Sequence, residues 1–197
     1  LTQLADAYDT WIQNNLVHSS MMDDPEFKAK IGDNAIKKCN EALRRIREGI
    51  HLINTSDTAF EAFCFMNRVM TYQRSIMFFS REYGKGVECS IKDFIDTEKK
   101  AKHFCWRPFQ IAFVLMNIKS IVDPCCDERE IVDLLYFPTG GGKTEAYLGL
   151  MAFTIANRRL TSKPDDELNK DGGVTVILRY TLRLLTAQQR DRLTKMI

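Results

Sequence analysis

The sequence predicts an α/β fold: an all-helical N-terminal region over residues 1–100, then the first strands and helices of a parallel α/β domain over residues 101–197. Apolar residues recur at helical spacing up to about residue 100. Beyond it, two short apolar runs bounded by turn residues are each followed by a helical pattern, an alternation typical of a parallel sheet. Because the chain begins with Leu1 rather than Met and ends inside a predicted helix, we expect a piece of a longer protein with an incomplete second domain.

Composition excludes several function classes. With 45% hydrophobic residues the chain can bury a core, but a net charge of +2 is too small to indicate nucleic-acid binding by bulk charge, so any such contact must be local. The longest strongly apolar run, Ile111 to Met116, is too short to cross a bilayer. The six cysteines form no CxxC pair and the three histidines lie far apart, so we expect neither a zinc site nor a disulfide framework, which favours the cytoplasm.

The clearest helix of the first region follows Asp33, an acceptable N-cap. Its apolar stripe, at alternating spacings of three and four, consists of Ile36, Cys39, Leu43, Ile46, Ile50 and Ile53. Arg44, Arg45 and Arg47 lie on the other faces, interleaved with glutamates. A solvated, charge-paired face is the simpler interpretation, and a phosphate-contacting surface is the alternative.

After residues 55–57, the run AFEAFCFMNRVMTYQRSIMFFS predicts a long helix that is apolar on more than one face. Within it, the polar side chains of Asn67, Arg68 and Arg74 must either find hydrogen-bond or charged partners or point into solvent. The glycines of EYGKGVEC then predict a turn and a domain boundary, followed by the polar connector KDFIDTEKKAKH.

The second region is predicted element by element. WRPFQIAFVLMNI is a buried helix with proline in its first turn, and VDPCCDERE is a polar break. IVDLLYF and VTVIL are strands buried on both faces of a parallel sheet. The segments EAYLGLMAFTIANRRL and TLRLLTAQQRDRLTKMI are the helices that follow these strands.

The peptide FPTGGGKT, residues 137–144, is the segment whose residue types indicate phosphate binding. Gly140, Gly141 and Gly142 allow a backbone that turns successive N–H groups toward phosphate oxygens, at the positive end of the following helix. Lys143 can then reach the β and γ phosphates, and the Thr144 hydroxyl can ligate Mg²⁺. The general P-loop pattern has glycine where this chain has Phe137. The alternative is a glycine-rich turn whose lysine is accidental.

FPTGGGKTE resembles motif I of the superfamily 2 helicases and translocases, which do not require the leading glycine. WRPFQ resembles the adenine-recognition element upstream of that motif. The resemblance implies a RecA-like motor domain, the cofactors ATP and Mg²⁺, and catalytic roles for Lys143 and Thr144. The nucleotide-binding set that it implies comprises Arg107, Gln110, Pro138, Thr139, Gly140, Gly141, Gly142, Lys143, Thr144 and Glu145.

RYTLRLLTAQQ looks like motif Ia, which contacts the nucleic-acid backbone, although its threonine and glutamine are spaced slightly further apart than usual. The resemblance implies that Thr181, Arg183 and Gln188 contact the nucleic-acid backbone. The alternative is that Arg179 and Arg183 are ordinary surface residues of the last helix.

More narrowly, the chain from about residue 60 looks like the helicase subunits of DISARM antiphage defence systems. That resemblance implies an ATP-driven motor on invading DNA, working with a second, DrmB-like subunit and a methyltransferase. Since no strand here carries the Asp-Glu pair such motors use, we expect no ATP turnover by this segment alone. Two other hypotheses remain: a P-loop switch or kinase of another class, and a non-enzymatic helical docking module.

Overall fold

The computed structural model describes residues 1–17, 32–86, 90–100, 105–138, 140–163, 170–179 and 183–194. The chain divides into two compact units. The first unit comprises residues 1–57 and 108–136, and the second comprises residues 58–107 and 137–197. Each unit therefore draws on both sides of residue 100. The predicted domain boundary there stays a prediction.

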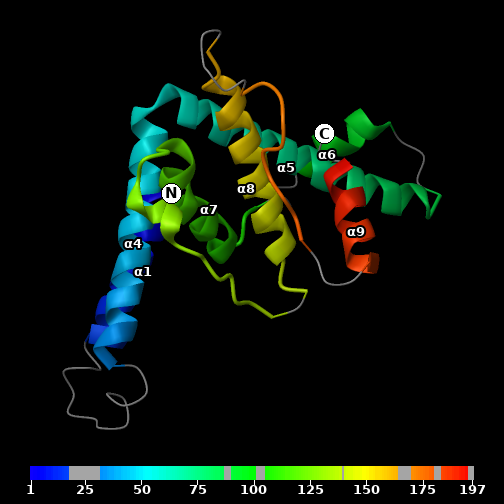
Figure 1. The fold of residues 1–197 in the computed structure, drawn as a ribbon. Helices are drawn as coiled ribbons and strands as arrows, with labels where there is room; N and C mark the ends of the chain where they lie inside the picture. Colours follow the sequence, from blue (N-terminus) through cyan, green and yellow to red (C-terminus); the bar gives the residue numbers. More distant parts are fainter. Residues whose placement is uncertain are drawn as a thin grey trace. The chain divides into compact units, whose positions relative to one another are not determined.

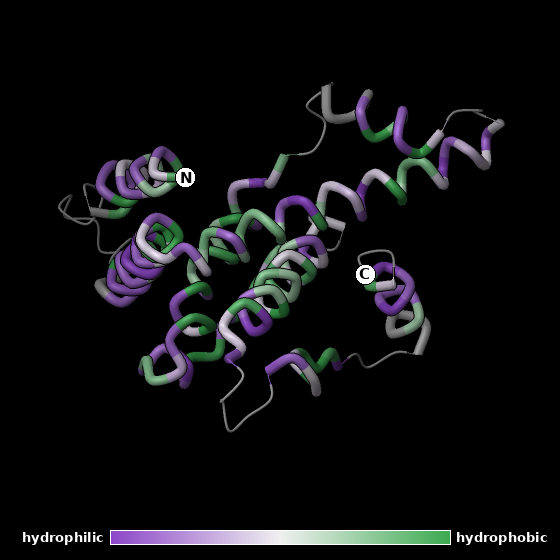
Figure 2. Tube along the Cα trace, turned by 90° about the horizontal axis from the view of Figure 1, so that it is seen from above, coloured by the Kyte–Doolittle hydropathy of each residue, from purple (hydrophilic) through white to green (hydrophobic). Residues whose placement is uncertain are grey.

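The first unit is helical. Its elements are α1 (Thr2–Trp11), the π-helix η1 (Ile12–Val17), α4 (Gly32–Thr55), α7 (Pro108–Val122) and the short 3₁₀ helix η2 (Asp127–Glu130). In both ribbon and tube, α1 lies alongside α4 (Figures 1 and 2). The hydropathy colours show α4 mostly hydrophilic with a narrower hydrophobic side, as a half-buried helix should be (Figure 2).

Helix α4 confirms its predicted stripe and packs on α7. Leu43, Ile46, Ile50 and Ile53 are all buried, whereas Ile36 and Cys39 are half-buried. The close approach of α7 depends on Gly49, because a Cβ there would overlap the backbone carbonyl of Leu115. Helix α7 begins at Pro108, as predicted, and buries Ile111, Phe113, Val114, Leu115 and Ile118.

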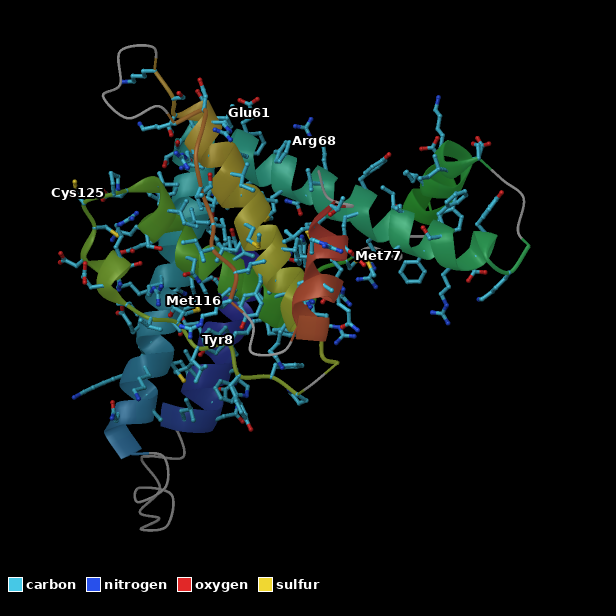
Figure 3. The ribbon with its side chains drawn as sticks, turned by 45° about the vertical axis from the view of Figure 1, so that its right-hand side comes forward. Tyr8, Glu61, Arg68, Met77, Met116 and Cys125 are labelled. Atoms are coloured by element: carbon cyan, nitrogen blue, oxygen red, sulfur yellow. The ribbon has the colours of Figure 1, made fainter. Side chains whose placement is uncertain are left out.

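The second unit contains α5 (Asp57–Tyr83), α6 (Ile91–Lys100), α8 (Lys143–Leu160) and α9 (Arg183–Thr194). The first residue of α5, Asp57, belongs to the first unit, and the rest of that helix belongs to the second. The polar residues of α5 meet the predicted requirement. Asn67 is hydrogen-bonded, Arg68 is exposed further along α5 than Glu61 (Figure 3), and the Arg74 guanidinium lies 5.6 Å from the centre of the Phe78 ring.

Residues 91–100, predicted as a polar connector, form helix α6. Ser90 caps it: the Ser90 hydroxyl accepts a hydrogen bond from the Asp93 backbone N–H at 3.1 Å and donates to the Asp93 carboxylate at 2.6 Å. The ring of Phe94 meets Phe79 of α5 edge-on, and Ile95 is buried. The prediction gave too much weight to the polar residues of this segment.

The predicted parallel strands, and the RecA-like sheet with them, are wrong. Nowhere in the described ranges does the structure contain a strand, and residues 131–138 and 174–179 have no regular secondary structure. Val132 is 94% exposed and Ile177 is 84% exposed, although both were expected in a buried sheet. The apolar pattern of these segments indicates β propensity. A β-strand forms, however, only when a neighbouring strand supplies backbone hydrogen-bond partners. The described fold is all-helical.

Two features are absent from the described residues. These residues include no helix with the length and apolar character needed to cross a membrane. Nor do His, Cys, Asp and Glu side chains within them gather in a group of three that could hold a metal ion.

Candidate functional site

The candidate site is the glycine loop that leads into α8 in the second unit. Gly142 is the N-cap of that helix, with φ of 92° and ψ of 26°, and Gly140 has φ of 79°. Side-chain-bearing residues rarely adopt such angles, so both positions require glycine. A glycine N-cap offers no side-chain oxygen to the first-turn N–H groups of α8, which leaves those donors available to an anion. Thr139 lies outside the described residues.

A tight turn precedes this N-cap. The Gly141 N–H donates to the Pro138 carbonyl at 3.0 Å. The ring of Phe137 lies so close to Gly141 that a Cβ there would overlap it. Phe137 therefore shapes the loop by packing at the position where the general pattern has glycine. No sequence pattern indicates this contact.

Lys143 opens α8 and turns back into the loop. Its ammonium donates to the carbonyls of Phe137 and Pro138, the latter at 3.3 Å. The lysine is half-buried. Backbone oxygens of the loop thus hold its charge, and its contact with phosphates stays a prediction.

Arg107, predicted to recognise adenine, reaches the same loop. Its guanidinium donates to the Gly141 carbonyl at 2.7 Å. The neighbouring Trp106 donates its indole N–H to the Asn67 side-chain oxygen at 2.7 Å and packs against Gly149 of α8. Sequence reasoning had selected Arg107 but had no means of pairing Trp106 with Asn67.

Gln110, the partner of Arg107 in the predicted adenine element, belongs to the first unit. It is the third residue of α7 and is 4% exposed. Its role in base recognition stays a prediction.

Two residues follow Lys143 in the predicted set. Thr144 is half-buried in the first turn of α8, and its hydroxyl stays the predicted Mg²⁺ ligand. The Glu145 carboxylate accepts a hydrogen bond from Arg192 of α9 at 3.3 Å, with side chains 28% and 33% exposed. This pair ties α9 to the start of α8, and sequence analysis missed it.

The predicted nucleic-acid residues are only partly described. Thr181 lies outside the described residues, Arg183 opens α9, and Gln188 is exposed on that helix. The helix itself was predicted correctly. The contact of these three residues with nucleic acid stays a prediction.

The arginines of α4 are paired with carboxylates. Arg44 pairs with Glu41, Glu48 and Glu128, and Arg45 pairs with Glu128 and Asp133. Arg47 pairs with Asp9 at 2.7 Å. A hollow of about 430 Å³ in the first unit is lined by Asp9, Asn40, Leu43, Arg44, Arg47, Glu48 and His51. Arg44 and Arg47 are exposed and paired with carboxylates, which supports the solvated, charge-paired interpretation for these two, whereas Arg45 is paired but buried.

Together these features define a helical protein with a glycine-rich loop at a helix N-terminus. No family model matches the chain. Over all of its length the chain is 45% identical to the DISARM protein DrmA of Bacillus paralicheniformis. It spans 17% of the length of that relative. The resemblance to DISARM proteins that the sequence motifs indicated is therefore confirmed.

Proposed function

We propose that this chain supplies the nucleotide-binding loop of an ATP-dependent DNA helicase or translocase in DISARM antiphage defence. One observation carries the proposal: Lys143, at the N-terminus of α8, directs its ammonium into a loop whose Gly140 and Gly142 have positive φ. This combination of a cation, flexible backbone and helix N-terminus is what a polyphosphate requires.

The residues present fit ATP and Mg²⁺. The first-turn N–H groups of α8 and the glycines would bind phosphate oxygens, Lys143 would exchange two backbone carbonyls for the β and γ phosphates, and Thr144 would hold Mg²⁺. Bound ATP supplies the free energy that drives a motor. The loop itself binds and orients the phosphates. The acidic residues that position the attacking water are expected in the longer protein.

Two observations favour a motor protein over the other classes of P-loop protein. The peptide FPTGGGKTE has the form of motif I of superfamily 2 helicases. The 45% identity to a DISARM protein supports a role beside other defence subunits, including a DrmB-like one. A P-loop switch or kinase would share the loop but not this relative.

The test is ATP hydrolysis by the full-length protein with and without DNA. Lys143→Ala should lower the hydrolysis rate by about a hundredfold or more, since it removes a preorganised cation from the phosphates. Lys92→Ala, which changes an exposed lysine of α6, is the matched control and should leave the rate unchanged. DNA stimulation should weaken steeply as salt rises. Equal rates for the wild type and Lys143→Ala would refute the proposal.

A further inference from the structure

The contact of Arg107 with the glycine loop bears on what this arginine does. The guanidinium donates to the carbonyl of Gly141, 34 residues away along the chain. A residue that reads adenine need not touch the loop backbone at all. Arg107 is thus connected to the part of the site that faces phosphate.

The backbone of Arg107 is held firmly by its neighbour. The Trp106 indole N–H donates to the Asn67 side-chain oxygen, and the Asn67 amide nitrogen in turn donates to the Phe63 carbonyl at 2.8 Å. On the other side, a Cβ at Gly149 would lie 2.6 Å from the Trp106 ring. The indole is therefore fixed between α5 and α8, and it sets the point from which Arg107 reaches the loop.

Holding the Gly141 carbonyl in one direction also sets the direction of the next backbone N–H group. In a planar trans peptide the C=O of one residue and the N–H of the next point in opposite directions. The guanidinium that holds the Gly141 carbonyl therefore orients the Gly142 N–H, at the N-cap of α8. Since Gly141 and Gly142 are both glycines, the peptide that joins them would otherwise rotate easily.

We propose that Arg107 is a positioning residue of the glycine loop: it orients the Gly142 N–H toward the phosphates and so governs polyphosphate affinity whatever the base. The inference rests on the proposed nucleotide-binding function and deepens it. Charge-assisted hydrogen bonds are about twice as strong as neutral ones, so losing this one should disorder the loop measurably.

The experiment measures binding of ATP and of inorganic tripolyphosphate, which has no base, to the full-length protein with Mg²⁺. Arg107→Ala should weaken both by the same factor, about tenfold for a lost charge-assisted bond. Arg107→Lys, which keeps one donor, should restore part of the loss. Arg68→Ala changes an exposed arginine of α5 and should leave both affinities unchanged.

A second readout needs no ligand. Hydrogen exchange of the peptide containing residues 137–145 should quicken in Arg107→Ala and recover partly in Arg107→Lys. The inference is overturned if Arg107→Ala weakens ATP but spares tripolyphosphate, because the arginine then reads the base. It is also overturned if neither affinity nor exchange changes. Failure of the wild type to bind either probe would instead refute the proposed function, and the inference with it.

Discussion

Arg45 and Asp133, 88 residues apart, are joined by two parallel hydrogen bonds of 2.7 Å. The Arg45 side chain is 4% exposed and that of Asp133 is 16% exposed. Hydrogen bonding to Asp133 raises the pKa of Arg45, against a burial effect that lowers it. Arg45 also contacts buried Glu128, so a single arginine of α4 holds both η2 and the extended segment after it.

Breaking this pair should destabilise the first unit. Asp133→Asn keeps the shape of the side chain but leaves the buried Arg45 guanidinium with Glu128 as its remaining countercharge, which costs about 3 kcal/mol. Urea unfolding followed by circular dichroism measures the loss. Asp9→Asn is the matched control, because its partner Arg47 is 50% exposed and such surface pairs contribute less than about 1 kcal/mol. Equal losses in both variants would contradict the account.

Acid should weaken the network around Arg44 and Lys119. Burial raises the pKa of Glu48, but hydrogen bonds from Lys119 and Arg44 outweigh it, so the folded-state pKa lies below the usual 4.5. Such a carboxylate contributes its full stabilisation above the unfolded-state pKa and loses it as pH falls through the lower folded-state value. The free energy of unfolding should therefore drop below about pH 4.5.

Glu48→Gln tests this directly. The variant should be less stable near neutral pH and should lose less stability between pH 5 and pH 3 than the wild type. Urea unfolding at several pH values gives both quantities. If the free energy of unfolding of Glu48→Gln falls with pH as steeply as that of the wild type, Glu48 is not the group responsible for the acid sensitivity.

The α4–α7 contact should not tolerate a larger residue at Gly49. Gly49→Ala would push a methyl group into the Leu115 carbonyl, and such overpacking costs about 1–3 kcal/mol. Gly84→Ala is the control, since a Cβ there meets its nearest atom at an ordinary 3.5 Å. Thermal unfolding compares the two. A Gly49→Ala protein as stable as the Gly84→Ala protein would mean that the helices do not pack this closely.

The correction of the predicted strand at residues 131–137 is itself testable. Val132 and Leu134 are 94% and 86% exposed, so Val132→Thr and Leu134→Thr in this chain should change the unfolding free energy by less than about 0.5 kcal/mol. Binding of a hydrophobic dye should fall, because exposed apolar surface is removed. Losses of several kcal/mol would indicate that both side chains are buried after all.

Helices were predictable because their evidence is local. The stripe of α4, the proline at the start of α7 and the apolar period of α8 each lie within one segment, and each helix formed where its pattern predicted. The glycine loop was also predictable, since positive φ at Gly140 and Gly142 follows from residue type and helix position.

Relationships between distant segments were not predictable. Strand pairing is non-local, so the composition of residues 131–137 could not reveal that no ladder forms in the described fold. The pairing of Arg45 with Asp133 and of Trp106 with Asn67 depends on how α4 and α5 meet later segments. Helix α6 was missed for a different reason: its Ser90 cap is a local signal that its polar residues obscured.

The most direct test of the central claim is a cryo-EM map of the full-length protein with Mg²⁺ and a slowly hydrolysed ATP analogue. The account predicts that the triphosphate lies within the loop of residues 137–144. It also predicts that the Lys143 ammonium leaves the Phe137 and Pro138 carbonyls to contact the β and γ phosphates. A map at saturating analogue in which the loop holds no phosphate and Lys143 stays on those carbonyls would contradict it.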